Sequence, residues 1–206
     1  MQLFFETTAY VRDRIRFISS LTLKIDMDEQ TRYTQTCLAN KSLFNLSIGK
    51  RLLRKDYVIE QGSIPAYSAT VHSPFAFINA SNITDFEYDY LIWGIDGAFD
   101  FRVLTRGTLF ATTDHCGAIQ IMDQELSPYY LLYEIDRIKK KYGFDRGLRA
   151  SLHNMRQIEV KIPIKSDGSF DYDLMNDIGR RYSSLLSCRS DILSQLGRAL
   201  DLKLVI

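Results

Sequence analysis

Alternating apolar and polar positions dominate the first two thirds of the chain and indicate short β-strands joined by turns. The stretches LTLKID (21–26) and YTQTCL (33–38) alternate on either side of the polar sequence DEQT, which predicts a hairpin. Extended structure is predicted again for GSIPAYSATV (62–71), YLIWGI (90–95) and RGTLFATT (106–113). Trp93, the single tryptophan, lies among apolar neighbours and is predicted to be a core residue.

Helical signals begin at residue 127. Ser127 followed by Pro128 is a favourable N-cap and first helical position, and YYLLYEIDRIKKK then carries apolar residues at helical spacing. Gly143 is predicted to end this helix. The next pattern, RQIEVKIPI (156–164), alternates as a strand with one buried and one solvated face.

One long helix is predicted from Asp173 to about Leu200. A heptad seam with one basic member runs along it, formed by Ile178, Tyr182, Leu185, Arg189, Ile192, Leu196 and Ala199. Such a helix would be roughly 40 Å long at 1.5 Å per residue. The apolar seam residues Ile178, Tyr182, Leu185, Ile192 and Leu196 therefore predict a coiled-coil-like helix for spacing or dimerisation. A terminal helix packed on its own domain is the alternative, and the sequence leaves it open.

These patterns predict an α+β fold in three parts. Residues 1–43 form a lead-in of helix or hairpin without a further assignment, and residues 44–170 form a mixed α/β domain with short strands. Residues 171–206 form the long helix.

Composition places the chain among ordinary soluble proteins, with 46% hydrophobic and 25% charged residues. We expect no membrane span, because no apolar run approaches the roughly 18 to 20 residues that a span needs, and no signal peptide. Cys37, Cys116 and Cys188 lie far apart without a CxxC pair, which predicts small apolar side chains in a reducing cytoplasm rather than disulfides or zinc ligands.

Positive charge is concentrated in one segment although the net charge is only +1. Between Arg137 and Arg156 there are seven Lys or Arg residues and one acidic residue, Asp145. A local basic segment on an otherwise acidic chain is what contact with a polyanion requires. The alternative is a solvated, lysine-rich helix end, and charge alone does not decide between the two.

Five motifs occur in a characteristic order. They are the basic turn Ile48–Lys55 followed by GSIPAYSA (62–69), then WGIDG (93–97), FATTDHCG (110–117), RGLRAS (146–151) before the strand at 158–163, and GSFD (168–171) before the long helix. In this order they resemble the target-recognition domains of type I restriction-modification specificity subunits and the related modules of fused, type IIG-like enzymes. The resemblance covers about residues 44–200, and the first 40 residues match nothing that we can name.

The resemblance implies a sequence-specific DNA-binding subunit that is not an enzyme and needs no cofactor. Its partners would be double-stranded DNA, an adenine-methyltransferase subunit and possibly a restriction subunit. The usual subunit of this family has two recognition domains and two spacer helices, whereas this chain has one of each. It therefore resembles a half-length subunit that would form a homodimer through its C-terminal helix, or the specificity module of a larger fusion.

Candidate DNA contacts are side chains that can pair with base edges or phosphates. We select Lys50, Arg51, Tyr67, Ser68, Thr113, His115, Arg146, Arg149, Ser151 and His153, and we rate the basic segment 137–156 highest. A solvated loop is the alternative for Lys50 and Arg51, and hydroxyls buried in a strand are the alternative for Tyr67 and Ser68. His115 beside Cys116 lacks a second ligand pair, so no metal site is predicted.

A metal-dependent nuclease of the PD-(D/E)xK type is the alternative function. Glu159 and Lys161 form an ExK sequence on a predicted strand, and Asp145 lies upstream, so a carboxylate pair around a metal ion is conceivable. The same residues also fit the solvated face of an ordinary strand. The residues Ser127-Pro128-Tyr129-Tyr130 resemble a methyltransferase motif only loosely, and the helix cap accounts for them.

Overall fold

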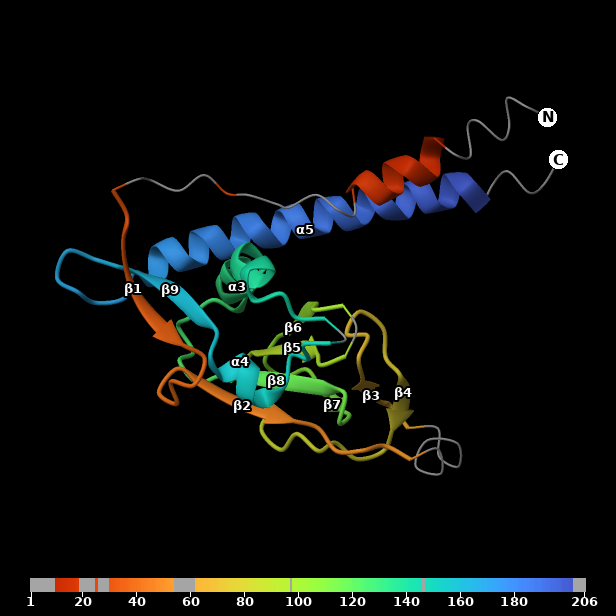
Figure 1. The fold of residues 1–206 in the computed structure, drawn as a ribbon, viewed down its shortest axis with the longest axis horizontal. Helices are drawn as coiled ribbons and strands as arrows, with labels where there is room; N and C mark the ends of the chain where they lie inside the picture. The colour runs from red at the N-terminus through yellow and green to blue at the C-terminus, as the bar shows by residue number, and fades with distance from the viewer. Residues whose placement is uncertain are drawn as a thin grey trace. The chain divides into compact units, whose positions relative to one another are not determined.

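The computed structural model describes residues 10–18, 25, 30–53, 62–96, 98–145 and 147–201, with the side chains of 199–201 left out. The chain divides into two compact units, which are described separately. The larger unit is Asp28–Gly179, and the smaller unit combines Met1–Met27 with Arg180–Ile206. Figure 1 shows the mixed helices and strands of this α+β fold, which ends in a long helix as predicted.

The described strands of the larger unit form three sheets. An antiparallel four-stranded sheet has the order β2-β8-β5-β6, formed by β2 (Phe44–Ile48), β8 (Cys116–Ile121), β5 (Tyr90–Gly94) and β6 (Phe101–Leu104). A three-stranded sheet has the order β4-β3-β7, formed by β4 (Ala76–Ile78), β3 (Ile64–Tyr67) and β7 (Ala111–Thr112), with β3 and β7 parallel. The third sheet pairs β1 (Arg32–Cys37) with β9 (Glu159–Ile164).

The core of the larger unit lies around β5, whose five residues are all buried. Trp93 is fully buried, which confirms its predicted place, and its indole Nε1–H donates to the carbonyl of Ala150 at 2.8 Å. Gly117 on β8 lies beneath the indole, opposite Trp93 in the strand register. The absence of a Cβ at Gly117 therefore leaves the space on β8 that the indole ring occupies.

The helix α3 (Pro128–Tyr142) begins and ends as its sequence predicted. The Ser127 hydroxyl accepts from the backbone N–H of Tyr130, and Gly143 adopts the left-handed conformation at φ 60°. A short helix, α4 (Leu152–Arg156), follows and was not predicted. Its N-cap is Ser151, whose hydroxyl accepts from the N–H of Asn154 at 3.3 Å.

Side chains of α3 close the outer edge of β9. The N–H of Glu159 donates to the Tyr142 hydroxyl at 2.9 Å, and the N–H of Lys161 donates to Glu134 Oε2 at 3.1 Å. The Tyr130 hydroxyl donates to the carbonyl of Lys161 at 2.8 Å. These groups take the hydrogen-bonding positions that a neighbouring strand would otherwise fill. This accounts for Glu134 being a buried carboxylate on α3.

Two strand predictions differ from the structure. The predicted partner of YTQTCL, residues 21–26, lies mostly outside the described residues, and β1 instead pairs with β9, about 120 residues later. RGTLFATT contains only the two-residue strand β7, whereas β6 and β8 lie in FRVL and CGAIQI, which were not predicted. Nearly every residue of β8 is buried, so it lacks the alternation that identifies a half-exposed strand.

The compact unit also differs in extent from the predicted domain of residues 44–170. It begins before residue 44, because β1 shares a sheet with β9, and it continues into the first turns of the long helix. The functional boundaries predicted from the sequence stay predictions.

The long helix α5 (Tyr172–Asp201) confirms the element predicted from residue 173. The burial of its apolar seam decreases along the helix. Ile178 and Tyr182 are buried within this chain, whereas Leu185 and Ile192 are 38% and 40% exposed and Leu196 is half-buried. In the smaller unit a helix of residues 10–18 lies beside the C-terminal part of α5 (Figure 1). None of the described helices is both long and apolar enough to span a bilayer.

The three cysteines have different surroundings. Cys116 is fully buried, and its burial raises the pKa of the thiol to about 12, so it is the small core residue that was predicted. Cys37 is half-buried, and Cys188 is exposed on α5, where the prediction of a buried apolar side chain was wrong. All three are free thiols.

Candidate nucleic-acid interface

Asp96, just after β5, joins two of the predicted DNA contacts. Its carboxylate lies 2.5 Å from His115 Nδ1 and 2.5 Å from Arg149 Nε, and it accepts a further bond from Arg149 Nη2 at 2.9 Å. The hydrogen bonds from His115 and Arg149 lower the pKa of Asp96 below its ordinary value. Asp96 is therefore ionised at neutral pH and fixes the direction of a histidine and an arginine that are both half-exposed.

Backbone pairing explains why these distant residues meet. The register of β5 with β8 ends at Gly94 opposite Cys116, and the N–H of Ile95 donates to the carbonyl of His115 at 3.0 Å. The indole of Trp93 holds Ala150, which places Arg149 at the same end of the sheet. The sequence contained Asp96 within the motif WGIDG, but nothing in the pattern singled out its carboxylate.

Lys50 and Arg51 leave the same end of the four-stranded sheet. They follow β2, whose last pair with β8 is Ile48 opposite Gly117, and the N–H of Gly49 donates to the carbonyl of Cys116 at 3.2 Å. A Cβ at Gly49 would run into the backbone carbonyl of Thr112, so only glycine allows this close passage. Both basic side chains are exposed.

The predicted hydroxyl-bearing residues lie mostly beneath this surface. Tyr67 and Thr113 are buried, with 4% and 3% exposure, so the alternative of a hydroxyl buried in a strand describes Tyr67, and Thr113 is buried just after β7. Thr113 Oγ1 donates to Ser68 Oγ at 3.0 Å and accepts from the N–H of His115 at 3.2 Å. These contacts hold the β7–β8 turn in place, and the half-buried Ser68 reaches the surface only in part.

Of the remaining predicted contacts, Ser151 uses its hydroxyl as the cap of α4, and His153 is exposed on that helix. Arg146 lies outside the described residues. The structure therefore brings together Lys50, Arg51, His115 and Arg149 at one end of the sheet, supported from below by Thr113.

A second acidic residue, Asp100, organises the other side of the β5–β6 connection. It lies 3.5 Å from His72 Nε2 and 3.5 Å from Lys139 Nζ, and the hydrogen bond from His72 is the main cause that lowers its pKa. Lys139 also pairs with Asp136 at 2.8 Å. Sequence reasoning missed Asp100 as well, because its partners lie about 30 and 40 residues away.

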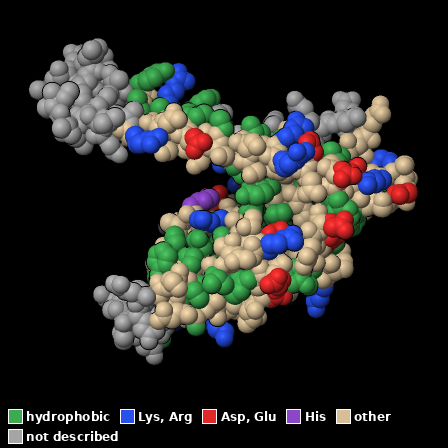
Figure 2. All heavy atoms as spheres, turned by 180° about the vertical axis from the view of Figure 1, so that it is seen from behind, with side chains coloured by type: hydrophobic (Ala, Val, Ile, Leu, Met, Phe, Trp, Pro, Cys, Tyr) green, Lys and Arg blue, Asp and Glu red, His purple; other side chains and the backbone are tan. Residues whose placement is uncertain are grey.

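The basic segment 137–156 is therefore less positive than its composition suggests. Arg137 pairs with Glu134, Lys139 with Asp136 and Asp100, and Arg149 with Asp96. In Figure 2 the Lys and Arg side chains of the visible face lie among Asp and Glu side chains rather than in one continuous patch. Contact with a polyanion at this site would depend on a few positioned cations, not on a broad basic field.

The residues that the structure describes give no support to the nuclease alternative. Asp145 Oδ1 accepts from the backbone N–H groups of Gly147 and Leu148, and these bonds lower the pKa of this exposed carboxyl. Glu159 Oε2 accepts from Gln35 Nε2 at 2.7 Å. Within the described residues there is no group of three His, Cys, Asp or Glu side chains placed to hold a metal ion.

Known proteins resemble this chain in sequence and in fold. No protein-family model matches it. A protein of Mycoplasma pneumoniae described as a type I specificity subunit is 22% identical over 78 residues, which are 38% of this chain and 23% of that protein. The type I restriction-modification S subunit of M. genitalium superposes with a TM-score of 0.64 at 18% identity, over 98% of this chain and 56% of its own.

Two further solved structures share the fold. The HsdS subunit of Thermoanaerobacter tengcongensis superposes with a TM-score of 0.57 at 11% identity, over 96% of this chain and 48% of its own. A chain from a study of type I restriction-modification complex assembly gives a TM-score of 0.54 at 11% identity, over 97% of this chain and 52% of its own. The fold is thus that of type I specificity subunits, as the motifs predicted, and the chain spans about half the length of these solved chains.

Proposed function

We propose that this chain is a sequence-specific DNA-binding specificity module of a type I restriction-modification system. The observation that carries the proposal is the fixing of His115 and Arg149 by Asp96, at the end of the sheet where Lys50 and Arg51 also emerge. A positioned arginine can pair with guanine or a phosphate, and a histidine with either. The shared fold supplies the second line of support.

The module would direct partners rather than catalyse a reaction itself. In this proposal an adenine-methyltransferase subunit, and through it a restriction subunit, is brought to the DNA site in the cytoplasm, and the chain needs no cofactor of its own. Support for a non-catalytic role comes from the described surface, where the carboxylates Asp96 and Asp100 are engaged with basic side chains of the same chain.

Replacement of Arg149 tests the proposal. From a pool of randomised duplexes at about 0.1 M salt, the whole chain together with its partner methyltransferase subunit is expected to enrich a defined sequence. Arg149→Ala should weaken binding to that sequence by roughly tenfold, because one lost base or phosphate contact costs about 1 to 3 kcal/mol. Fluorescence anisotropy with a labelled duplex measures the change.

Lys41→Ala is the matched control, because Lys41 is an exposed cation on the turn before β2. Lys41→Ala should leave the affinity for the selected duplex unchanged, apart from the small decrease that the loss of one positive charge causes. Equal losses from Arg149→Ala and Lys41→Ala would contradict a specific interface, and a pool with no enriched sequence would contradict the function as a whole.

We further propose that two copies associate through the exposed part of the α5 seam. Leu185 and Ile192 are seven residues apart on one helix face, and both are partly exposed in the described chain. Ile178 and Tyr182, which the sequence also assigned to dimerisation, are already buried and would contribute only by supporting α5. A two-fold pair would present identical recognition surfaces, so the preferred duplex should be an interrupted palindrome.

Charged residues in the seam test this association. The double variant Leu185→Glu, Ile192→Glu is expected to weaken self-association by at least tenfold, because a dimer would bury two carboxylates in an apolar contact. Sedimentation equilibrium of the whole chain at micromolar concentration measures it, with Ser184→Glu, Ser190→Glu as a control of equal charge. A wild-type chain that stays a monomer both alone and with the methyltransferase subunit would refute the dimer.

A further inference from the structure

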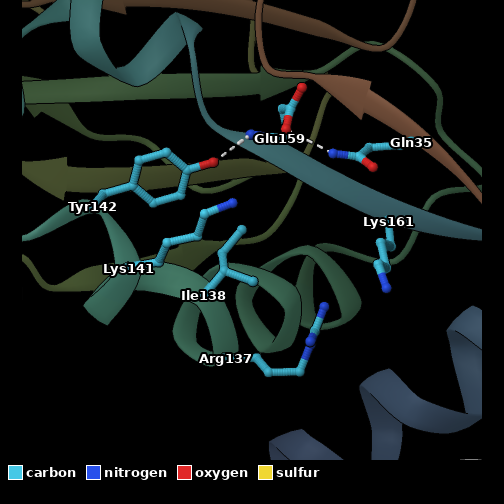
Figure 3. Close-up of a pocket in the computed structure, with 7 residues that line it drawn as sticks. All are labelled: Gln35, Arg137, Ile138, Lys141, Tyr142, Glu159 and Lys161. Carbon is cyan, nitrogen blue, oxygen red and sulfur yellow. Dashed lines mark hydrogen bonds between the residues drawn. The ribbon is translucent and has the colours of Figure 1, made fainter.

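A pocket lies between the last two turns of α3 and the β1–β9 pair. Its volume is about 230 Å³, and its lining residues are Gln35, Arg137, Ile138, Lys141, Tyr142, Glu159 and Lys161. Figure 3 shows the side chains of Arg137, Lys141 and Lys161 arranged around one space, with Glu159 and Gln35 joined to each other on the strand side. All belong to the larger unit.

The cations of this pocket are held in place but not fully neutralised. Arg137 forms two hydrogen bonds with the buried carboxylate of Glu134, at 2.9 and 3.0 Å, and this pairing raises the pKa of the guanidinium. Lys141 Nζ lies 5.9 Å from the centre of the Tyr142 ring, and Lys161 Nζ lies 5.7 Å from that of Tyr33. Among the described carboxylates neither lysine has an ion-pair partner, so the pocket offers two lysine charges to an incoming anion.

The pocket lies on a different side of α3 from the Asp100 cluster. Arg137 and Lys141 are four residues apart and share one face, whereas Lys139 between them points about 200° away, given 3.6 residues per turn. Lys139 contacts Asp100 on the β5–β6 connection, and the other two line the pocket beside β9. The pocket and the contact of Lys139 with Asp100 therefore lie on different faces of α3.

The pocket's shape and lining favour a protein side chain over a phosphate of the duplex backbone. It is a recess with an apolar contact, Ile138, and an aromatic ring, Tyr142, on one side. The second oxygen of Glu159 can accept a hydrogen bond, which a phosphodiester cannot give because it has no donor, whereas a backbone N–H close to a carboxylate can. A protruding Glu or Asp residue supplies both groups, because its side chain is the anion and its backbone N–H is the donor.

We propose that this pocket binds an acidic side chain of a partner protein. Lys141 and Lys161 are the cations that bind its carboxylate, and Arg137, held by Glu134, is a third cation in the pocket. The inference rests on the proposed function only in that the partner would be the methyltransferase subunit. Glu134 acts as a positioning residue, because it orients Arg137 and at the same time holds β9 through the N–H of Lys161.

The test uses the whole chain labelled at its isoleucine δ1 methyl groups. A capped hexapeptide of alternating Glu and Ala is titrated, and the NMR signal of Ile138 in the pocket is followed. It should shift with the Glu peptide and stay in place with the matching Gln and Ala peptide. The double variant Lys141→Ala, Lys161→Ala should bind the Glu peptide roughly tenfold or more weakly, because both charge-assisted contacts are lost. Lys41→Ala with Lys140→Ala removes equal charge from exposed positions outside the pocket and should leave the binding unchanged.

Three results would overturn the proposal. In the first, neither peptide shifts the NMR signal of Ile138. In the second, the two double variants bind the Glu peptide with equal affinity. In the third, a DNA duplex displaces the peptide, and the variant with Lys141→Ala and Lys161→Ala loses affinity for DNA. The last result would assign the pocket to nucleic acid, and inorganic phosphate shifting Ile138 more strongly than the peptide would do the same. Duplex selection is measured separately, so DNA binding without peptide binding would refute the pocket and leave the specificity function intact.

Discussion

Gly117→Ala is expected to lower the free energy of unfolding by about 3 kcal/mol, the upper range for overpacking a core. A Cβ at this position would overlap the indole ring of Trp93, which is fully buried and tied to the carbonyl of Ala150. Neither partner can move cheaply, because Gly117 lies in β8 and Trp93 in the neighbouring β5. Urea unfolding followed by circular dichroism measures the loss.

A double-mutant cycle with Trp93→Phe shows whether the overlap is the cause. The phenyl ring lacks the outer ring of the indole, so the extra methyl group of Gly117→Ala should cost less than about 1 kcal/mol in that background. Trp93→Phe by itself should destabilise the chain, because the carbonyl of Ala150 loses its donor. If the destabilisations of the two single variants simply added in the double variant, Gly117 would be needed for its backbone conformation and not for the space that it leaves to the indole.

Glu134→Ala is expected to destabilise the chain by about 2 to 3 kcal/mol. The carboxylate is buried, and its loss leaves the N–H of Lys161 without an acceptor and Arg137 without its partner. We place the effect below that of a fully buried ion pair because the Arg137 side chain is 43% exposed and can be hydrated. Thermal and urea unfolding of the variant measure it.

Glu134→Gln is the matched control for the charge. Its amide oxygen can still accept from Lys161 or from Arg137, so roughly half of the loss or less is expected. If the Gln and Ala variants were equally unstable, Glu134 would stabilise the chain only through its ion pair with Arg137 and not through its hydrogen bond to the N–H of Lys161. The stability of both variants should be compared in the presence of high salt, which screens the exposed side of Arg137.

The sequence determined the elements whose signals are local. Ser127 and Gly143 defined the ends of α3, the heptad spacing defined α5, and alternation identified β9. Local signals suffice here because caps and periodicity depend on residues within one or two turns. The ordered motifs likewise led to a fold that the solved specificity subunits share.

Tertiary structure decided which predicted residues meet and which are buried. Asp96, the carboxylate that joins His115 to Arg149, was not identified in the sequence, because its partners lie 19 and 53 residues away. For Tyr67 the sequence left open a surface hydroxyl or one buried in a strand, and the pairing of β3 with β7 placed it in the interior. Thr113, selected as a DNA contact, is buried as well. The pairing of β1 with β9 was equally invisible, since contacts between residues far apart in the chain leave no spacing in the sequence.

The charge of the basic segment shows the same division. Composition alone gave seven cations and one acid between residues 137 and 156, and that count is correct. Folding brings Glu134, Asp136, Asp96 and Asp100 against three of those cations, so the field at the surface depends on positions that composition does not contain. The sequence therefore determined the class of fold and the candidate residues. The pairs Arg137–Glu134 and Lys139–Asp136 are neighbours on one helix, but only the packing of distant segments brought Arg149 to Asp96 and Lys139 to Asp100. Packing also decided how exposed each cation remains, and the strength of an ion pair depends on distance and exposure.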